Sequence, residues 1–108
     1  MATYYSNYQE FLIDMPELAL ELAAAVGGVA GWETEELTLY NNLAEFAEYE
    51  LTEGWYVDLG LERDYHGAPH PLDFIDFDAF GVALADSWDA SSHFLGAAGN
   101  VITTSYGW

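Results

Sequence analysis

The clearest hydrophobic pattern in the chain lies in residues 71–88, where aromatic residues and aspartates alternate and then take up a helical period. Phe77, Phe80 and Leu84 are spaced so that they fall on one side of a helix. Asp76 stands just before this stripe, where its carboxylate can accept from the free N–H groups of the first turn. The pattern therefore predicts a helix that starts after Asp76 and has one apolar face. The acids expected on its other sides are Asp78, Asp86 and Asp89.

A second helix is predicted to follow Asn42. Asn42 and Glu45 have the spacing of a capping box, and the glycine at position 54 ends the pattern. An apolar stripe at helical spacing consists of Leu43, Phe46, Ala47 and Leu51. Its acids are expected in two exposed groups, with Glu45 and Glu48 on one flank and Glu50 and Glu53 on another.

The N-terminal region predicts a helix with a break in it. Ser6 and Gln9 have capping-box spacing, so the helix is expected to start near Asn7. The sequence Asp-Met-Pro at 14–16 interrupts or restarts it, because the residue before proline avoids helical geometry and proline suits a first turn. The glycine pair at 27–28 is expected to end the helix.

The remaining segments predict loops and a small sheet. Residues 31–39 fit a loop with either a short extended or a short helical piece, and residues 55–71 fit a short helix or turn followed by a loop. The β-branched run at 101–106 predicts a strand, which can pair with residues 93–95 to form a hairpin. We therefore expect an α+β fold with about three helices and a small antiparallel sheet near the C-terminus, in a single acidic domain spanning residues 1–108.

Composition supports a folded domain with an unusual charge. The chain has 108 residues, of which 52% are hydrophobic and 17% aromatic, far too apolar for a disordered acidic tail. Nineteen Asp and Glu residues face one basic residue, Arg63, which gives a formal net charge of −18. Such a field repels nucleic acid and anionic membranes and speeds encounter with basic surfaces.

Other compositional features narrow the expected location. There is no cysteine, so disulfides and thiolate metal sites are excluded. The N-terminal residues lack the basic and apolar regions of a signal peptide, and the apolar run at 22–30 is too short to span a bilayer. We expect a protein of the host-cell cytoplasm that does not enter a membrane.

Catalytic and metal-binding patterns are weak. Asp73, Asp76 and Asp78 lack the ligand spacing of an EF-hand loop, and His66 and His70 lie in a loop rather than on one helix face. With so many carboxylates, an acid/base pair carries almost no signal. A single arginine cannot neutralise a nucleic-acid backbone. The sequence therefore predicts no enzyme, no cofactor, no bound metal and no direct nucleic-acid binding.

The acids themselves suggest a function. Carboxylates one helical turn apart lie about 5–6 Å from each other, which is the scale of phosphate spacing along a nucleic-acid strand. Acids held on a rigid scaffold could therefore occupy a basic groove in place of DNA. The candidate phosphate-mimicking residues are Glu45, Glu48, Glu50, Glu53, Asp58, Glu62, Asp64, Asp73, Asp76, Asp78, Asp86 and Asp89. The alternatives are an acidic adaptor that binds a basic protein without mimicry and a halophilic housekeeping domain.

Two segments resemble a known family. Phe-Ile-Asp-Phe-Asp-Ala-Phe-Gly at 74–81 resembles a segment near the C-terminal end of the ArdA-type antirestriction proteins, and Tyr-Asn-Asn-Leu-Ala-Glu-Phe-Ala at 40–47 is similar to an upstream segment of that family. The resemblance implies a DNA-mimicking inhibitor, made by phages or mobile elements, that blocks the DNA-binding groove of host restriction complexes. The positions matching the family that would contribute acids are Glu45, Asp76 and Asp78.

The chain also departs from that family. Val82 and Ala83 stand where the family usually has a basic and an acidic residue, and family members are longer. A shorter track of charge makes the DNA channel of a CRISPR effector a reasonable alternative target. The expected partner is thus a basic DNA-binding protein or nucleoprotein complex, either a restriction enzyme or a CRISPR effector. A second copy of the chain, in a homodimer, is a further candidate partner.

Overall fold

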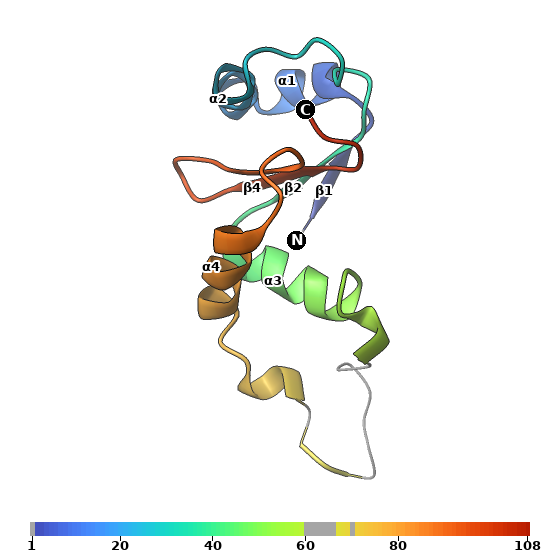
Figure 1. The fold of residues 1–108 in the computed structure, drawn as a ribbon, viewed down its shortest axis with the longest axis vertical. Helices are drawn as coiled ribbons and strands as arrows, with labels where there is room; N and C mark the ends of the chain where they lie inside the picture. Colours follow the sequence, from blue (N-terminus) through green and yellow to red (C-terminus); the bar gives the residue numbers. More distant parts are fainter. Residues whose placement is uncertain (1, 60–66, 70) are drawn as a thin grey trace.

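A four-stranded antiparallel sheet lies between two layers of helices in the computed structural model, which describes residues 2–59, 67–69 and 71–108 (Figure 1). The layers follow one another along the longest axis of the molecule, and the Cα positions extend 50 × 23 × 23 Å. The body is therefore a rod about twice as long as it is wide.

The sheet joins segments from both ends of the chain. Its strands are β1 (Thr3–Tyr5), β2 (Leu37–Tyr40), β4 (Val101–Thr104) and β3 (His93–Leu95), in that spatial order. The antiparallel hairpin of β3 and β4 confirms the expected sheet near the C-terminus. That expectation was incomplete, because β2 and β1 extend the same sheet with segments from the first half of the chain.

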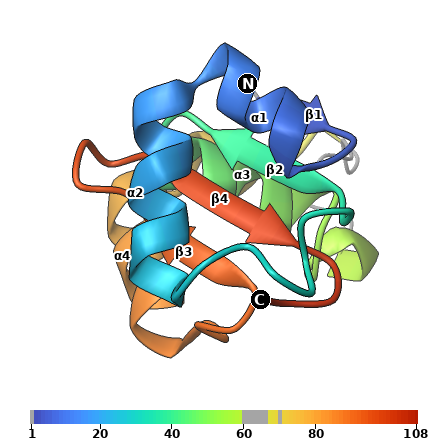
Figure 2. The same ribbon diagram turned by 90° about the horizontal axis from the view of Figure 1, so that it is seen from above.

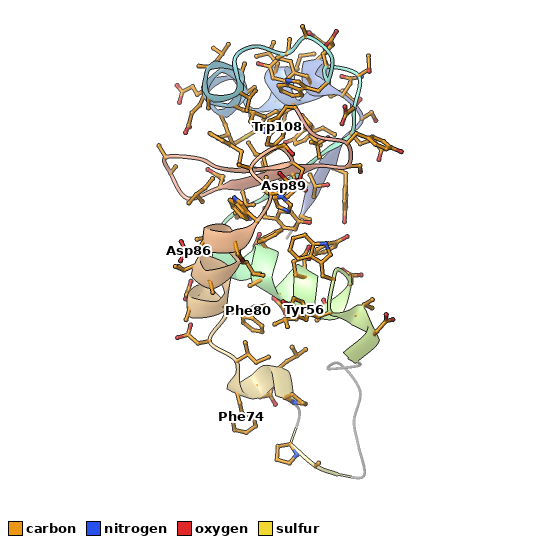
Figure 3. The ribbon with its side chains drawn as sticks, viewed as in Figure 1. Tyr56, Phe74, Phe80, Asp86, Asp89 and Trp108 are labelled. Atoms are coloured by element: carbon orange, nitrogen blue, oxygen red, sulfur yellow. The ribbon has the colours of Figure 1, made fainter. Side chains whose placement is uncertain are left out.

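The N-terminal layer covers one face of the sheet with α1 (Tyr8–Asp14) and α2 (Pro16–Val26), as Figure 2 shows from above. Side chains from both helices enclose a hydrophobic cluster with the apolar residues of the strands. Trp108 lies on the same side of the sheet (Figure 3), with its ring centroid 5.7 Å from that of Trp32. Its indole Nε1 donates to the Ala90 carbonyl oxygen at 3.0 Å, which fixes the C-terminal segment.

The start of α1 differs by one residue from the prediction. The N-cap pair is Asn7 and Glu10: the Asn7 side chain accepts from the Glu10 N–H at 2.9 Å, and the Glu10 carboxylate accepts from the Ser6 N–H at 2.9 Å. The predicted pair of Ser6 and Gln9 was therefore wrong. The two possible caps, Ser6 and Asn7, differ by one residue in where the helix begins. The start after Asn7 places the rings of both Tyr8 and Phe11 in the core, which favours it.

Proline and glycine set the ends of α2 as expected. Pro16 occupies the first position of α2, so of the two expected outcomes, an interrupted or a restarted helix, the chain has the restarted one. The described residues consequently contain four α-helices rather than about three. At the other end Gly27 adopts a left-handed conformation with φ of 82°, which turns the chain so that the Gly28 N–H also donates to the Ala23 carbonyl oxygen, at 2.7 Å.

The C-terminal layer consists of α3 (Leu43–Thr52) and α4 (Phe77–Ser87). Both predicted caps are confirmed: Asn42 accepts from the Glu45 N–H at 2.9 Å, and Asp76 accepts from the Ala79 N–H at 3.0 Å. The apolar residues expected to hold this layer gather in one cluster with Tyr40 and Val101 of the sheet. They are Phe46 and Leu84, which are buried in the cluster, and Phe77, Phe80 and Trp88, which pack against it. Two short 3₁₀ helices, η1 (Val57–Leu59) and η2 (Pro71–Phe74), flank the layer.

A glycine allows α3 and α4 to approach closely. A Cβ atom at Gly81 would lie 2.6 Å from the Leu43 carbonyl oxygen, much closer than atoms can pack. Leu43 and Gly81 belong to the two segments, 40–47 and 74–81, whose sequences resemble the antirestriction family. The structure thus brings these two segments into direct contact.

Candidate partner-binding surface

Most of the candidate acids are on the surface. Glu45 is half-buried and Glu50 is buried, whereas Glu62 and Asp64 lie outside the described residues. The exposed candidates come from α3, α4 and the segments beside them. They are Glu48, Glu53, Asp58, Asp73, Asp76, Asp78, Asp86 and Asp89. In Figure 3, Asp86 projects from the outer side of α4.

The expectation that Glu50 lies on an exposed flank is wrong. Its side chain is only 5% exposed, and its Oε2 accepts from the Trp55 N–H at 3.2 Å. The position follows from the helical period, because Glu50 comes four residues after Phe46 and three after Ala47, both fully buried. Gly54 then brings the chain back over the carboxylate: a Cβ there would lie 2.7 Å from Glu50 Oε1.

Burial also changes the acid-base properties around Glu50. Desolvation raises the pKa of the Glu50 carboxyl, and the hydrogen bond from the Trp55 N–H offsets part of that increase. The pKa of the Tyr40 hydroxyl is raised, first by its burial and then by the charges near it. Burial lowers the pKa of the His93 imidazole. The interior of this layer therefore disfavours the charged forms of all three groups.

Several candidate acids also hold the local backbone. Besides the Asp76 cap, the Glu45 carboxylate accepts from the Asn41 N–H at 2.9 Å. Asp89 Oδ1 accepts from the Ser91 hydroxyl at 2.7 Å and from the Ser91 N–H at 2.9 Å, and these bonds lower the pKa of the Asp89 carboxyl. Because each of these acids is bonded to its own backbone, its position relative to the scaffold is fixed.

Two glutamates of α3 and its C-cap residue, Glu53, line a hollow beside the helix. The hollow has a volume of about 330 Å³, and Tyr4, Tyr40 and Tyr49 form its aromatic part. Its acids are Glu45, Glu48 and Glu53. Glu53 is thus grouped with Glu45 and Glu48, and the predicted pairing of Glu53 with Glu50 on a separate flank was wrong.

A second hollow lies between the sheet and α3, and the same three tyrosines separate it from the first. Its volume is about 420 Å³. We call it the aromatic cleft and define it by Tyr4, Tyr40, Tyr49, Glu50, Trp55 and His93. The polar residues Glu36, Thr38, Ser92, Thr103, Thr104 and Ser105 complete its lining. No local sequence pattern predicts it, since its lining comes from all four strands, α3 and the turn after α3.

His93 is held in one orientation at the edge of this cleft. Its ring stacks on Trp88 with the centroids 5.2 Å apart, and the ring of Trp55 lies 5.5 Å away on the cleft side. His93 Nδ1 is 3.0 Å from the Asp89 carbonyl oxygen. A carbonyl oxygen only accepts, so this contact favours the tautomer with the proton on Nδ1.

Aromatic contacts also tie the segment after α3 to α4. Figure 3 shows Tyr56 and Phe80 facing one another between the two, with their ring centroids 5.6 Å apart. Phe74 of η2 instead points away from the body and is 76% exposed. The packing between α3 and α4 therefore reaches the η1 segment but leaves the ring of Phe74 uncovered.

Comparison with protein-family models, curated proteins and solved structures finds no match. Within the described residues, no group of three or more His, Cys, Asp or Glu side chains is placed to hold a metal ion. None of the described helices is long and apolar enough to cross a bilayer. The candidate surface is thus characterised by its own geometry and charge.

Proposed function

We propose that this protein is a DNA mimic that inhibits a host defence complex by occupying its basic DNA-binding groove. The phage or mobile-element origin and the target, a restriction enzyme or a CRISPR effector, belong to the same proposal. The observation that supports it best is a rod-shaped body with exposed carboxylates in both helical layers. The inhibitor would act by binding rather than by catalysis.

The dimensions and the charge are on the scale of a short DNA duplex. A length of 50 Å corresponds to about one and a half turns of B-DNA at about 34 Å per turn. Duplex DNA of that length carries about 30 phosphate charges, at one per about 1.7 Å. The net charge of −18 is therefore more than half that of the DNA it would replace.

The scaffold supports mimicry because it holds acids in fixed places. Asp76 and Asp89 are bonded to backbone N–H groups and are still exposed. Fixed acids keep the entropy cost of binding low, since fewer side chains become ordered in the complex. A groove that reads phosphates by charge needs such a layout and no bases.

Competition with DNA tests the proposal directly. Labelled duplex DNA is bound to a purified restriction complex or CRISPR effector, and the protein is added while fluorescence anisotropy is recorded. We expect displacement of the DNA, with an inhibition constant that weakens about 1,000-fold or more between 50 and 200 mM salt, as for ligands that make many phosphate-like contacts. A stable ternary complex with DNA would instead indicate an adaptor.

Matched triple variants test which layer provides the binding acids. The C-terminal variant carries Glu48→Gln, Asp78→Asn and Asp86→Asn, and the N-terminal control carries Glu10→Gln, Glu17→Gln and Glu33→Gln; all six acids are exposed. Each variant loses three negative charges. We expect the inhibition constant of the C-terminal variant to weaken about 10-fold or more. The slope of its logarithm against the logarithm of the salt concentration should fall by about one per lost contact, with a smaller effect in the control. The reverse order would refute the assignment of the binding acids to the C-terminal layer.

A further inference from the structure

Glu50 is a buried carboxylate that faces a cleft. Its side chain is 95% buried, it contributes to the lining of the aromatic cleft, and the Trp55 N–H donates to its Oε2. The chain has a single lysine or arginine, Arg63, which lies outside the described residues. No guanidinium or ammonium group of the described residues can therefore balance the charge of Glu50, and a buried carboxylate is costly until a cation pairs with it.

Aromatic side chains form one part of the cleft lining, and threonine, serine and Glu36 side chains form the rest. Tyr4 is 68% exposed and Trp55 is 60% exposed, although both rings are large enough to fill a core position. Tyr40 and Tyr49 contact each other with ring centroids 5.5 Å apart. The face of an aromatic ring attracts a cation, most strongly when water is excluded. Aromatic rings beside a buried carboxylate, with a second acid, Glu36, in the same lining, are the features of a site for an organic cation.

We propose that the aromatic cleft binds one arginine side chain of a basic partner protein, with the guanidinium group against the Glu50 carboxylate. This inference rests on the proposed function for the kind of partner, and it adds a defined contact to a surface otherwise read by charge alone. The cleft volume of about 420 Å³ lies within the range of specific ligand pockets.

Arginine suits this site better than lysine. A guanidinium is planar, stacks on aromatic rings, is weakly hydrated and can donate two parallel hydrogen bonds to a carboxylate. A lysine ammonium is more strongly hydrated and loses more hydration free energy on entering an aromatic cleft. The neighbouring hollow with Glu45, Glu48 and Glu53 shares three tyrosines with the cleft and would attract basic residues beside the bound arginine.

The test uses small probes on the full chain. N-acetyl-arginine amide is titrated into the protein while NMR follows the indole N–H of Trp55 and the ring protons of His93. We expect saturable shifts of both, with binding at least about 10-fold weaker for the matching citrulline probe, which has the shape of arginine without its charge. Binding by the lysine probe is expected to fall between the two.

A matched pair of variants assigns the binding to Glu50. Glu50→Gln keeps an acceptor for the Trp55 N–H and removes the charge, whereas the control Glu53→Gln removes the same charge from an exposed residue nearby. We expect Glu50→Gln to weaken binding of the arginine probe about 10-fold or more, and Glu53→Gln to weaken it less than about 2-fold. Each protein is also measured with Arg63→Gln, so that the chain's own guanidinium is removed from the assay.

The outcomes separate this proposal from the proposed function. Equal binding of the arginine and citrulline probes by the wild-type protein, or equal effects of Glu50→Gln and Glu53→Gln, would overturn the arginine site even if the protein displaces DNA. Arginine binding that depends on Glu50 in a protein that forms a ternary complex with DNA would support the site and refute DNA mimicry. The citrulline comparison needs no variant, so a folding defect in Glu50→Gln does not weaken the test.

Discussion

The two helical layers cover opposite faces of the same sheet, yet they do so to different extents. Among the described residues, ten buried ones form the hydrophobic cluster on the α1 and α2 side, and five form the cluster on the α3 and α4 side. The N-terminal layer thus encloses a core, whereas the C-terminal layer leaves the aromatic cleft open against the sheet. We infer that the enclosed layer contributes more to stability, and the surface proposed for recognition lies on the other layer.

The charges are divided in a related way. Seven of the nineteen acids precede residue 42, and the twelve candidate acids all lie in residues 45–89. Carboxylates near one another repel, which destabilises a compact layer. The layer with fewer buried apolar residues therefore carries more of the acids, as expected of a surface selected for a partner rather than for stability.

The largest predicted effect is on the enclosed core. Phe11 is fully buried between α1 and the sheet, and Phe11→Ala is expected to lower the free energy of unfolding by about 3–5 kcal/mol. Ile13 is on the same helix but is 73% exposed, so Ile13→Ala should change it by less than about 0.5 kcal/mol. Urea unfolding followed by circular dichroism measures both. Similar losses in the two variants would show that α1 does not pack as described.

The second prediction concerns the contact between α3 and α4. Gly81→Ala places a methyl group 2.6 Å from the Leu43 carbonyl oxygen, so the helices must move apart, at a cost of about 1–3 kcal/mol. Hydrogen exchange should show the loss of protection in α3 and α4 and leave α1 and α2 unchanged.

Gly27→Ala is the matched control for this substitution. A Cβ at Gly27 meets nothing within 4 Å, so only its left-handed backbone, with φ of 82°, is strained. That strain should cost about 1 kcal/mol and affect the end of α2. If Gly81→Ala left the protection of α3 and α4 unchanged, the close approach of these helices would be refuted.

The sequence was most informative where one residue type determines the local geometry. Pro16 starts a helix, Gly27 ends one, and Asn42 and Asp76 cap the helices that follow them. These signals act within a few residues, so they can be found without knowledge of the fold. The α+β class and the C-terminal hairpin followed from the same local patterns.

The features that were missed depend on contacts far apart in the sequence. The strand Thr3–Tyr5 is too short to show an alternating pattern, and it is fixed only by pairing with Leu37–Tyr40. Burial of Glu50 could have been inferred from its spacing to Phe46, but its charge suggested a surface position. The aromatic cleft needs the whole sheet and α3 together, so no local pattern could predict it.

The third prediction tests a cap on the acidic layer. Asp76 accepts from the Ala79 N–H, so Asp76→Ala should lower the free energy of unfolding by about 1 kcal/mol. Asp86 is exposed in the last turn of α4, where the helix dipole disfavours a negative charge. Asp86→Ala should therefore be neutral or stabilising by less than about 0.5 kcal/mol. Thermal unfolding at fixed salt measures the difference, and equal effects would argue against a capping role for Asp76.

The smallest predicted effect concerns Glu50 and depends on pH. Burial raises the pKa of Glu50 above its ordinary value of 4.5, so the folded state binds this proton more tightly than the unfolded state. The contribution of Glu50 to stability is fully present below pH 4.5 and is lost as the pH rises through the raised pKa. Glu50→Gln does not ionise, so it should be more stable than the wild type at pH 7, by up to about 1 kcal/mol.

The same reasoning predicts how the stability difference between Glu50→Gln and wild type depends on pH. The difference between Glu50→Gln and wild type should shrink toward zero below pH 4.5, where Glu50 is protonated in both states. His93 has the opposite sign, because its lowered pKa stabilises the fold above pH 6.5 and that gain is lost as the pH falls through the lowered value. Since His93 is present in both proteins, its effect cancels in the difference. Urea unfolding from pH 4 to 8 measures the difference in the free energy of unfolding, and the exposed Glu53→Gln is a control whose difference from wild type should not change with pH. A Glu50→Gln protein that is less stable than wild type at pH 7 would show that the fold needs the charge of Glu50. The proposal that the C-terminal layer gives up stability for recognition would then be refuted.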